Sequence, residues 1–474
     1  AVLHLGLFFD GTRNNAHNLA RGRPQPPQPR PALLRADDDS TYQSRLTSSY
    51  DNGTTNIARL HQLYPDSRRA PLAEPSLAIY VEGVGTRDDA EDDLIGLAFG
   101  IGASGVRAKV QRALHELLPA ALSALAPHWQ QPLHGVQVDL FGFSRGAAAA
   151  RDLANQLRGW DANQWRLRLQ GAGLPCAADF ALPRPALRFV GLFDTVVAVS
   201  GRRADEQPRI ALPAGIAERV VQLSARDEHR QHYALTTVAP THEEIALPGV
   251  HANIGGGYDQ LEEGPKLLGR PRRQPLRRAP VDDYQTPTLA MLQATTVYAE
   301  AQADAERWRQ QLGATEKEVW VDVWHQWQQQ RRAGSRSVMM APVLHVTAAV
   351  VLRRRIDWRY QLIALQVMQQ RAAEAGVQWS ADAAQVPGWE LPAPLQPIAR
   401  RLLAGQTLTP TQEALLRRRY LMQSAHWNFD ALGDTALTFA ADSGVSELPY
   451  RPGPGLFYIN RPTVDGRRLV LPNA

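Results

Sequence analysis

The sequence predicts an α/β fold: an α/β-hydrolase-like, mostly parallel sheet with helices on both faces and an added helical cap region. Apolar runs at residues 2–9, 77–82 and 187–193 each end in a polar or glycine-rich turn, as the buried strands of a parallel sheet do. A further apolar run, residues 136–141, passes through a glycine turn directly into an alanine-rich helix. From residue 282 to residue 404 the pattern becomes largely helical.

The first strand, residues 2–9 (VLHLGLFF), is followed by Asp10 and Gly11 in the turn DGTRNN. Such a turn lies at the carboxyl edge of the sheet, where the sites of α/β proteins collect. A plain Asx turn explains the same residues equally well. Residues 17–40 are rich in proline and arginine and then acidic, so we expect an exposed, poorly ordered insertion there.

A short helix at residues 54–63 and a second strand at 77–82 come next, and this strand ends in a glycine turn. Residues 94–105 (LIGLAFGIGASG) are apolar and glycine-rich. They either line an acyl-sized cavity or form a tightly packed loop. Residues 106–125 carry apolar side chains at helical spacing and predict a helix.

The strand at residues 136–141 leads into GFSRG (residues 142–146), a G-x-S-x-G pattern, and then into a helix. Strand, tight turn and helix form the context in which this pattern indicates a nucleophile elbow. The flanking glycines give backbone freedom, and the helix N-terminus directs N–H groups toward an anion beside Ser144. We predict Ser144 as a catalytic nucleophile; the alternative is a glycine-rich turn that only packs tightly.

A serine alkoxide is too basic to form unaided, so the nucleophile needs a base, and the base needs an orienting acid. In α/β hydrolases the order along the chain is serine, acid, histidine. Asp194 directly follows the strand at 187–193 and fits the acid. Asp139 lies inside the elbow strand, while Asp205 and Asp227 have a loop-like context, so all three are weaker candidates.

His251 is the predicted base, because it opens the segment HANIGGGY, whose three glycines imply a close backbone approach. A satisfied structural histidine is the alternative interpretation. His242 lies in the same segment but lacks the glycine loop. His426 is the main rival, since a late histidine also satisfies the order along the chain.

The oxyanion donors are predicted to be the backbone N–H of Arg145 and one N–H from the first turn, at Asp10 or Gly11. No metal and no other cofactor is expected. The histidines show no paired spacing such as H-x-x-x-H, which disfavours a metal-dependent hydrolase.

We predict a hydrolase core at residues 1–260, a mainly helical cap with possible membrane contact at 261–425, and a C-terminal segment at 426–474 that packs back on the core. The cap is predicted from three amphipathic or Trp-rich segments, which are residues 298–312, 320–332 and 358–375. Residues 339–352 fit a helix or a strand. Residues 266–278 hold six basic and no acidic residues, which fits a solvated loop or a contact with phospholipid head groups.

Composition narrows the functional classes. The net charge of +5 favours acidic surfaces such as anionic lipids but is too weak to indicate nucleic acid. Cys176 is the single cysteine, so no intramolecular disulfide forms and no cysteine metal site is built. No stretch approaches the roughly 18 apolar residues of a membrane span. The first residues already follow a strand pattern, so no signal peptide is expected.

Five motifs in order resemble a known family, the Tle1-type lipase effectors among the bacterial α/β hydrolases with an FDGT N-terminus. The resemblance spans most of residues 1–260 and continues weakly through 358–379 and 417–428. The motifs are FFDGTRNN (8–15), YVEGVGT (80–86), GFSRGAAAAR (142–151), LFDTV (192–196) and PGVHANIGGGY (248–258).

The resemblance implies phospholipase A activity on membrane phospholipids, with Ser144 as nucleophile, His251 as general base and Asp194 as orienting acid. It also implies synthesis in the bacterial cytoplasm and delivery by a type VI secretion system into a competitor's periplasm. The implied partners are a VgrG-like spike or an adaptor and a cognate immunity protein. One departure is Ala252-Asn253, where the family often has Ser-Asp. A soluble carboxylesterase and a non-catalytic hydrolase-like binding module remain the alternatives.

Overall fold

The computed structural model describes residues 1–12, 14, 53–84, 105–197, 207–259, 261–276, 287–331, 339–427 and 460–474, with backbone alone at 326–331 and 339–342. The predicted insertion at 17–40, nearly all of the segment 94–105, and Asp205 lie outside these residues. The chain divides into two compact units. The first holds residues 1–259, 358–412 and 467–474, and the second holds 260–357 and 413–466.

The first unit is built on a six-stranded sheet with the order β2-β1-β3-β4-β5-β7. Every neighbouring pair in it is parallel, which confirms the predicted fold class. Its predicted strands are present, because their continuous apolar runs suit a sheet that is covered on both faces. The strands are β1 (Val2–Phe9), β2 (Ser76–Val81), β3 (Gly135–Phe143), β4 (Leu187–Phe193), β5 (Arg219–Ala225) and β7 (Glu243–Leu247).

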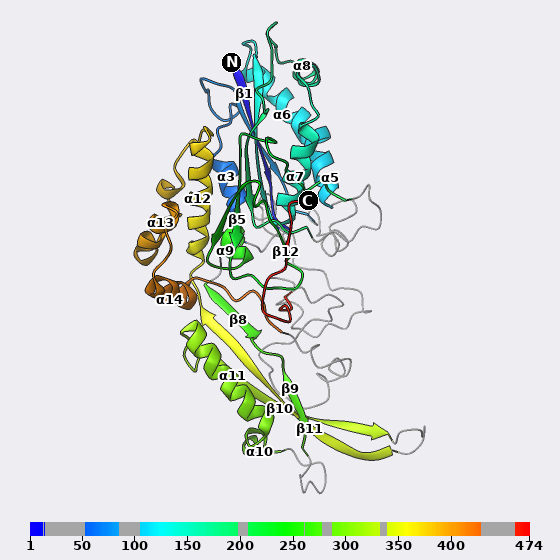
Figure 1. Cartoon of the computed structure of the whole chain (residues 1–474), viewed down its shortest axis with the longest axis vertical. Helices are drawn as coiled ribbons and strands as arrows, with labels where there is room; N and C mark the ends of the chain where they lie inside the picture. Colours follow the sequence, from blue (N-terminus) through cyan, green and yellow to red (C-terminus); the bar gives the residue numbers. More distant parts are fainter. Residues whose placement is uncertain are drawn as a thin grey trace. The chain divides into compact units, whose positions relative to one another are not determined.

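Helices cover both faces of this sheet (Figure 1). On one face, α5 (Val106–Arg112) runs through a π-helical turn at Ala113–Leu117 into α6 (Leu118–Leu125). Together with α7 (Arg145–Leu157) they pack on the odd-numbered side chains of β1 and form the main hydrophobic core. A 3₁₀ turn (Ala126–His128) and α8 (Ala162–Gly171) complete this side.

The opposite face is rich in aromatic rings. Phe8 and Phe141 stack with centroids 5.0 Å apart, and Tyr64 and Trp379 pack against them. This layer is covered by α3 (Asn56–Leu63) and by α12 (Gln361–Glu374), whose Met368 reaches Gly191 of β4. A short helix, α9 (His251–Gly255), follows β7 in the sequence. Around and after α12, the chain forms α13 (Gln396–Leu403), α14 (Pro410–Arg419) and 3₁₀ turns at Trp358–Tyr360, Ala383–Gln385 and Ala393–Leu395.

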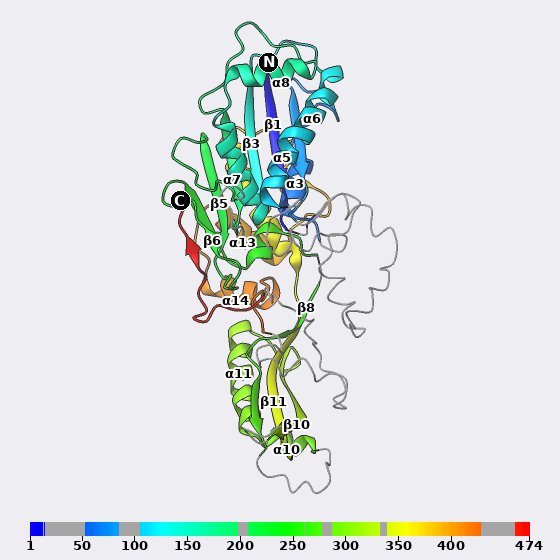
Figure 2. The same ribbon diagram turned by 90° about the vertical axis from the view of Figure 1, so that its right-hand side faces the viewer.

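The second unit contains an antiparallel sheet in the order β10-β11-β8, with β9 also paired to β11. Helix α11 lies along this sheet in both views (Figure 2), and its apolar side chains form a separate core with β10 and β11. The elements are β8 (Glu262–Leu267), β9 (Arg272–Pro275), α10 (Leu289–Gln293), α11 (Thr296–Leu312), β10 (Val319–Arg331) and β11 (Met339–Arg355).

The prediction of a helical segment at residues 320–332 was wrong, since β10 occupies it. Val319, Val321 and Val323 alternate with polar or tryptophan residues, a period of two that suits a strand, and β-branched residues favour that conformation. The segment left open at 339–352 is also a strand, β11. The region 261–425 is therefore not uniformly helical, and its residues 358–412 belong to the first unit.

Within the predicted C-terminal segment, residues 426, 427 and 460–466 belong to the second unit, and residues 467–474 lie in the first. There β12 (Val470–Leu471) pairs in parallel with β6 (Leu235–Thr236). Asn473 donates to the carbonyl of Leu212 and accepts from its N–H, both at 2.9 Å. Within the described residues, every helix is too short or too polar to cross a bilayer.

Candidate active site

Ser144 stands at a sharp turn between β3 and α7. Its backbone has φ 57° and ψ −123°, a conformation that non-glycine residues rarely adopt and that costs strain energy. The Ser144 N–H donates to the carbonyl of Phe193 at 3.0 Å, and its own carbonyl accepts the first helical bond from Ala147 at 3.1 Å. The residue is 5 % exposed. The strained turn therefore presents the serine at the carboxyl end of the sheet.

The two glycines of the G-x-S-x-G pattern are required by close packing. A Cβ atom on Gly142 would lie 2.6 Å from the Cα of Ala147. A Cβ atom on Gly146 would lie 2.3 Å from the carbonyl oxygens of Phe9 and Asp10. The first turn of α7 therefore lies directly against the end of β1, which explains why position 146 has no room for a side chain.

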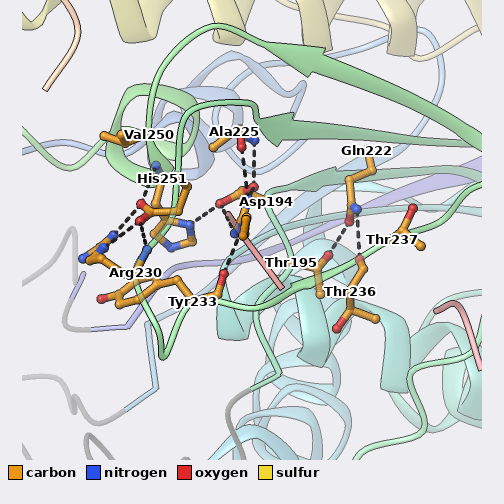
Figure 3. A network of polar contacts seen from close by, with 12 residues as sticks. Asp194, Thr195, Gln222, Ala225, Arg230, Tyr233, Thr236, Thr237, Val250 and His251 are labelled. Atoms are coloured by element: carbon orange, nitrogen blue, oxygen red, sulfur yellow. Dashed lines mark hydrogen bonds and ion pairs between the residues drawn. The ribbon is translucent and has the colours of Figure 1, made fainter. Parts of the chain in front are cut away.

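Asp194 and His251 are hydrogen-bonded to each other, as the sequence predicts. Asp194 follows β4 with φ 46° and is fully buried. Its Oδ2 lies 2.5 Å from Nδ1 of His251, the first residue of α9, and Figure 3 shows the imidazole turned toward this carboxylate. Its Oδ1 accepts the N–H of Ala225 at 2.8 Å, which fixes the carboxylate against the end of β5.

The imidazole of His251 lies beside the elbow. Its centroid is 4.6 Å from that of Phe143, the residue immediately before Ser144, and 5.0 Å from that of Tyr233. The His251 backbone N–H donates to Oε2 of Glu228 at 3.2 Å. Since Nδ1 faces Asp194, Nε2 is the nitrogen left for a substrate or nucleophile proton. Ser144 follows β3 and Asp194 follows β4, and His251 lies against Phe143, so all three residues lie at the carboxyl end of the sheet.

The charges of the site suit a base that is neutral at physiological pH. Burial lowers the pKa of His251, and the neighbouring Asp194 offsets this only in part. Burial opposes ionisation of Asp194, but the charge of Arg468 and the hydrogen bond from His251 together hold its pKa well below its ordinary value. An ionised acid behind a neutral imidazole is the arrangement that general-base catalysis needs.

Three charged residues around this pair were not predicted. Glu228 and Arg230 form a buried ion pair at 2.9 Å, and the Arg230 guanidinium lies 3.3 Å from the ring centroid of Tyr233. Arg468 contacts both carboxylate oxygens of Asp194. Asp194 comes directly after β4, and Glu228 and Arg230 lie in the loop that follows β5, so the loops after the sheet's strands are the signal that could have found them.

The predicted oxyanion turn is bonded differently from the expectation. The Asp10 N–H donates to the carbonyl of Val81 at 2.9 Å, so Asp10 is not placed as an oxyanion donor. The Gly11 N–H donates to Oδ1 of Asp10 at 2.7 Å. The side chain of Arg145 donates through Nε to Oγ1 of Thr12 at 2.7 Å, which joins the start of α7 to this turn.

The carboxyl of Asp10 is fully buried and accepts three hydrogen bonds. Besides Gly11, the hydroxyl of Tyr80 donates to it at 2.5 Å and that of Thr55 at 2.9 Å. Burial raises the pKa of Asp10 to about 6, and the three donors limit the rise. Sequence reasoning treated this residue only as a source of a backbone N–H.

The rival acids and bases have other contacts. Asp139 is paired with Arg188 at 2.5 Å, and Oδ2 of Asp227 accepts the N–H of Gly249 at 2.6 Å. Nε2 of His242 lies 2.9 Å from the carbonyl of Leu212. His426 belongs to the second unit, where its Nδ1 lies 3.4 Å from the carbonyl of Trp427.

Comparisons with known proteins agree with the motifs. Residues 5–160, which include Ser144 but neither Asp194 nor His251, match the family model described as T6SS, Phospholipase effector Tle1-like, catalytic domain. The structure of the Tle1 effector bound to the VgrG spike from the Type 6 secretion system has a TM-score of 0.66 with 23 % identity, covering 100 % of this chain and 94 % of that one. At this identity the likeness shows a shared fold.

A second solved structure, an uncharacterized protein from Pseudomonas aeruginosa, has a TM-score of 0.34 and 22 % identity, over 54 % of this chain and 42 % of that one. None of the curated proteins matches the chain.

Proposed function

We propose that this chain, whose residues 5–160 match the model of the Tle1-like phospholipase effector catalytic domain, hydrolyses glycerophospholipid acyl esters with a Ser144-His251-Asp194 triad. The observation that carries the proposal is the 2.5 Å bond between Asp194 and His251. This bond lies beside the strained turn that presents Ser144.

The reaction is acyl transfer to water. The Oγ of Ser144 attacks the ester carbonyl while Nε2 of His251 takes its proton, and Asp194 stabilises the imidazolium through Nδ1. The carbon–oxygen bond to the glycerol then breaks, and His251 returns the proton to that oxygen, which releases a lysophospholipid. Water, deprotonated by His251, then attacks the acyl-serine. The bond between the acyl carbon and Oγ breaks, and His251 returns the proton to Oγ, which releases the fatty acid and restores Ser144.

The oxyanion that forms in each step needs preorganised donors. The backbone N–H of Arg145, in the first turn of α7, is one proposed donor. The N–H of Gly11 is the second, and it serves only after its bond to Oδ1 of Asp10 is released. The missing side chain at Gly146 supports this pairing of donors, because it lets the first turn of α7 lie against the end of β1 and the start of the Gly11 turn.

The match of residues 5–160 to the Tle1-like catalytic domain supports a biological setting for this reaction. We propose that membrane phospholipids of a target bacterium are the substrate, cleaved at the sn-1 or sn-2 ester, and that the chain acts in the target's periplasm after type VI secretion. A solved structure with the same fold is that of the Tle1 effector bound to the VgrG spike. A VgrG-like spike is therefore the proposed delivery partner, and an immunity protein the proposed antagonist in the producing cell.

The test uses purified protein and liposomes of phosphatidylethanolamine and phosphatidylglycerol, with the products identified by mass spectrometry. We expect fatty acid and lysophospholipid from the wild type and none from Ser144→Ala. Ser123→Ala, on the exposed side of α6, is the control and should retain full turnover.

Two results would overturn the proposal. Turnover of soluble short-chain esters without any release from liposomes would indicate a soluble carboxylesterase. Failure of a fluorophosphonate to label Ser144 in the folded wild type would indicate a non-catalytic binding module.

A further inference from the structure

We propose that Arg468, in the C-terminal segment, is a positioning residue that fixes the Asp194 carboxylate and sets the basicity of His251. This inference rests on the proposed triad. The Arg468 guanidinium donates from Nη1 to Oδ1 of Asp194 at 2.6 Å and from Nη2 to Oδ2 at 2.9 Å. Its side chain is 7 % exposed. Such a bidentate ion pair fixes the orientation of the carboxylate and also stabilises its negative charge.

The fold holds Arg468 at this point through its own side chain and through the residues that follow it. Its own Nε donates to the carbonyl of Tyr233 at 2.7 Å. The following residues form β12, where the carbonyls of Leu469 and Leu471 accept the N–H groups of Leu235 and Thr237 at 2.9 and 3.0 Å. After β12, the side-chain amide of Asn473 is hydrogen-bonded to the backbone of Leu212. The C-terminal segment is thus anchored so that the guanidinium of Arg468 contacts the carboxylate of Asp194.

The Asp194 carboxylate is fully occupied as a result. Oδ1 accepts from Ala225 and Arg468, and Oδ2 accepts from His251 and Arg468. With both oxygens held, the carboxylate has one orientation, and that orientation directs Oδ2 at His251. The fixed carboxylate in turn holds the imidazole in the tautomer that leaves Nε2 free to accept a proton.

The charge of Arg468 also acts on the imidazole. A carboxylate shared with a guanidinium stabilises an imidazolium less than an unshared one does, because the positive charges oppose each other. Among the described residues, the imidazole also faces the rings of Phe143 and Tyr233 and lies near the Glu228–Arg230 ion pair, whose opposite charges act on it in opposite directions. Arg468 differs from these groups because it is bonded to the same carboxylate as His251.

The sign of the effect distinguishes this role from a purely structural one. Replacing Arg468 by glutamine leaves the Asp194 charge uncompensated, so the imidazolium becomes more stable and the pKa of His251 rises. The acid limb of the activity profile then moves to higher pH. Arg468→Lys keeps the positive charge but loses the bidentate geometry. It should therefore lower kcat while leaving the acid limb of the activity profile at the same pH.

The experiment measures the pKa of His251 directly, by NMR titration of the imidazole in Ser144→Ala with and without Arg468→Gln. We expect Arg468→Gln to raise it by about half a unit to one unit, less than a charge in direct contact produces, because Arg468 acts through Asp194. We expect Arg468→Lys to change it by less than about 0.3 units. Arg467→Gln, at the exposed neighbouring position, is the matched control and should not change it.

Activity of the same variants on a soluble ester gives the second readout. We expect the acid limb of kcat/KM to move up in Arg468→Gln, and kcat to fall about tenfold in Arg468→Lys. An unchanged His251 pKa in Arg468→Gln, or unfolding of both variants, would overturn the inference. A wild type in which Ser144 is not labelled by a fluorophosphonate would instead overturn the proposed function, and the NMR titration would still report on Arg468.

Discussion

The ring of Phe143 lies 4.6 Å from the imidazole of His251, centroid to centroid, with 34° between the planes. Phe143 is the residue before Ser144, so one buried side chain connects the nucleophile's turn to the base. Two glycines enclose this ring, because a Cβ atom on Gly255 or on Gly11 would lie well inside contact distance of it. The ring of Phe143 therefore lies in contact with the Gly11 turn and with the helix that carries His251, and it belongs to the residue just before the nucleophile.

Phe143→Ala should reduce both stability and activity. Removing a buried phenyl ring costs about 3–5 kcal/mol of unfolding free energy, and the imidazole loses the surface that orients it. Urea unfolding and kcat on a soluble ester measure the two effects. Phe180→Ala, also buried in the first unit but placed outside the site, is the control. Equal losses of kcat in both variants would show that stability alone accounts for the effect of Phe143.

Gly146→Ala should displace the nucleophile turn. The added methyl group would meet the carbonyl oxygens of Phe9 and Asp10, and relieving that overlap costs about 1–3 kcal/mol and moves the start of α7. We expect kcat/KM to fall at least about a hundredfold, because displacements near 1 Å have that effect. Gly171→Ala, where a Cβ atom would meet open space, is the control. Full activity in Gly146→Ala would contradict the packing argument.

Asp194→Asn should leave the fold in place and lower kcat by about ten-thousandfold, the loss seen when a triad acid is neutralised in this way. An asparagine can donate to Nδ1 and so favours the wrong tautomer of His251. Asp227→Asn, the rival acid in a loop, should change kcat by less than about threefold. Steady-state kinetics on a soluble ester measure kcat for both variants. A larger loss of kcat in Asp227→Asn than in Asp194→Asn would make Asp227 the acid of the triad.

His251→Gln should abolish fluorophosphonate labelling of Ser144, because the hydroxyl then lacks a base. His426→Gln is the informative comparison, since His426 also satisfies the order of a hydrolase triad along the sequence. We expect its labelling rate to stay within about threefold of the wild type. Loss of labelling in His426→Gln with retention in His251→Gln would make His426 the base.

Local patterns account for much of the fold and for the centre of the site. Continuous apolar runs predict the strands of a parallel sheet, and the ends of those strands predict Ser144 and Asp194. The order along the chain and the three glycines then select His251. Each of these signals lies within a few residues of the side chain concerned, which is why sequence reasoning could reach them.

Other features depend on contacts between distant segments. Arg468 reaches Asp194 across a sequence separation of 274 residues, and the tail that carries it has no periodic pattern. The N–H of Asp10 donates to the carbonyl of Val81 in the neighbouring strand, and no local sequence pattern reveals this bond. The segment at residues 320–332 combines tryptophans with amphipathic spacing, and pairing with β11 decides in favour of a strand.

The buried carboxyl of Asp10 should make stability fall as pH rises from about 4 to about 6. Its pKa is about 6 in the folded chain and near its ordinary value of 3.8 in the unfolded chain. Between these values the folded state binds more protons than the unfolded state, so raising the pH favours unfolding. The shift of about two units corresponds to roughly 3 kcal/mol. This sign is opposite to that of a salt-bridged carboxylate such as Asp194.

Asp10→Asn isolates this contribution, because every other titrating group is common to both proteins. We expect the unfolding free energy of the wild type, measured in urea at pH values from 4 to 7, to decrease relative to that of Asp10→Asn. Most of the change should lie below pH 6.5, after which the difference becomes constant. Parallel curves over the whole range would mean that Asp10 titrates alike in both states, with its three hydrogen bonds fully offsetting the effect of burial.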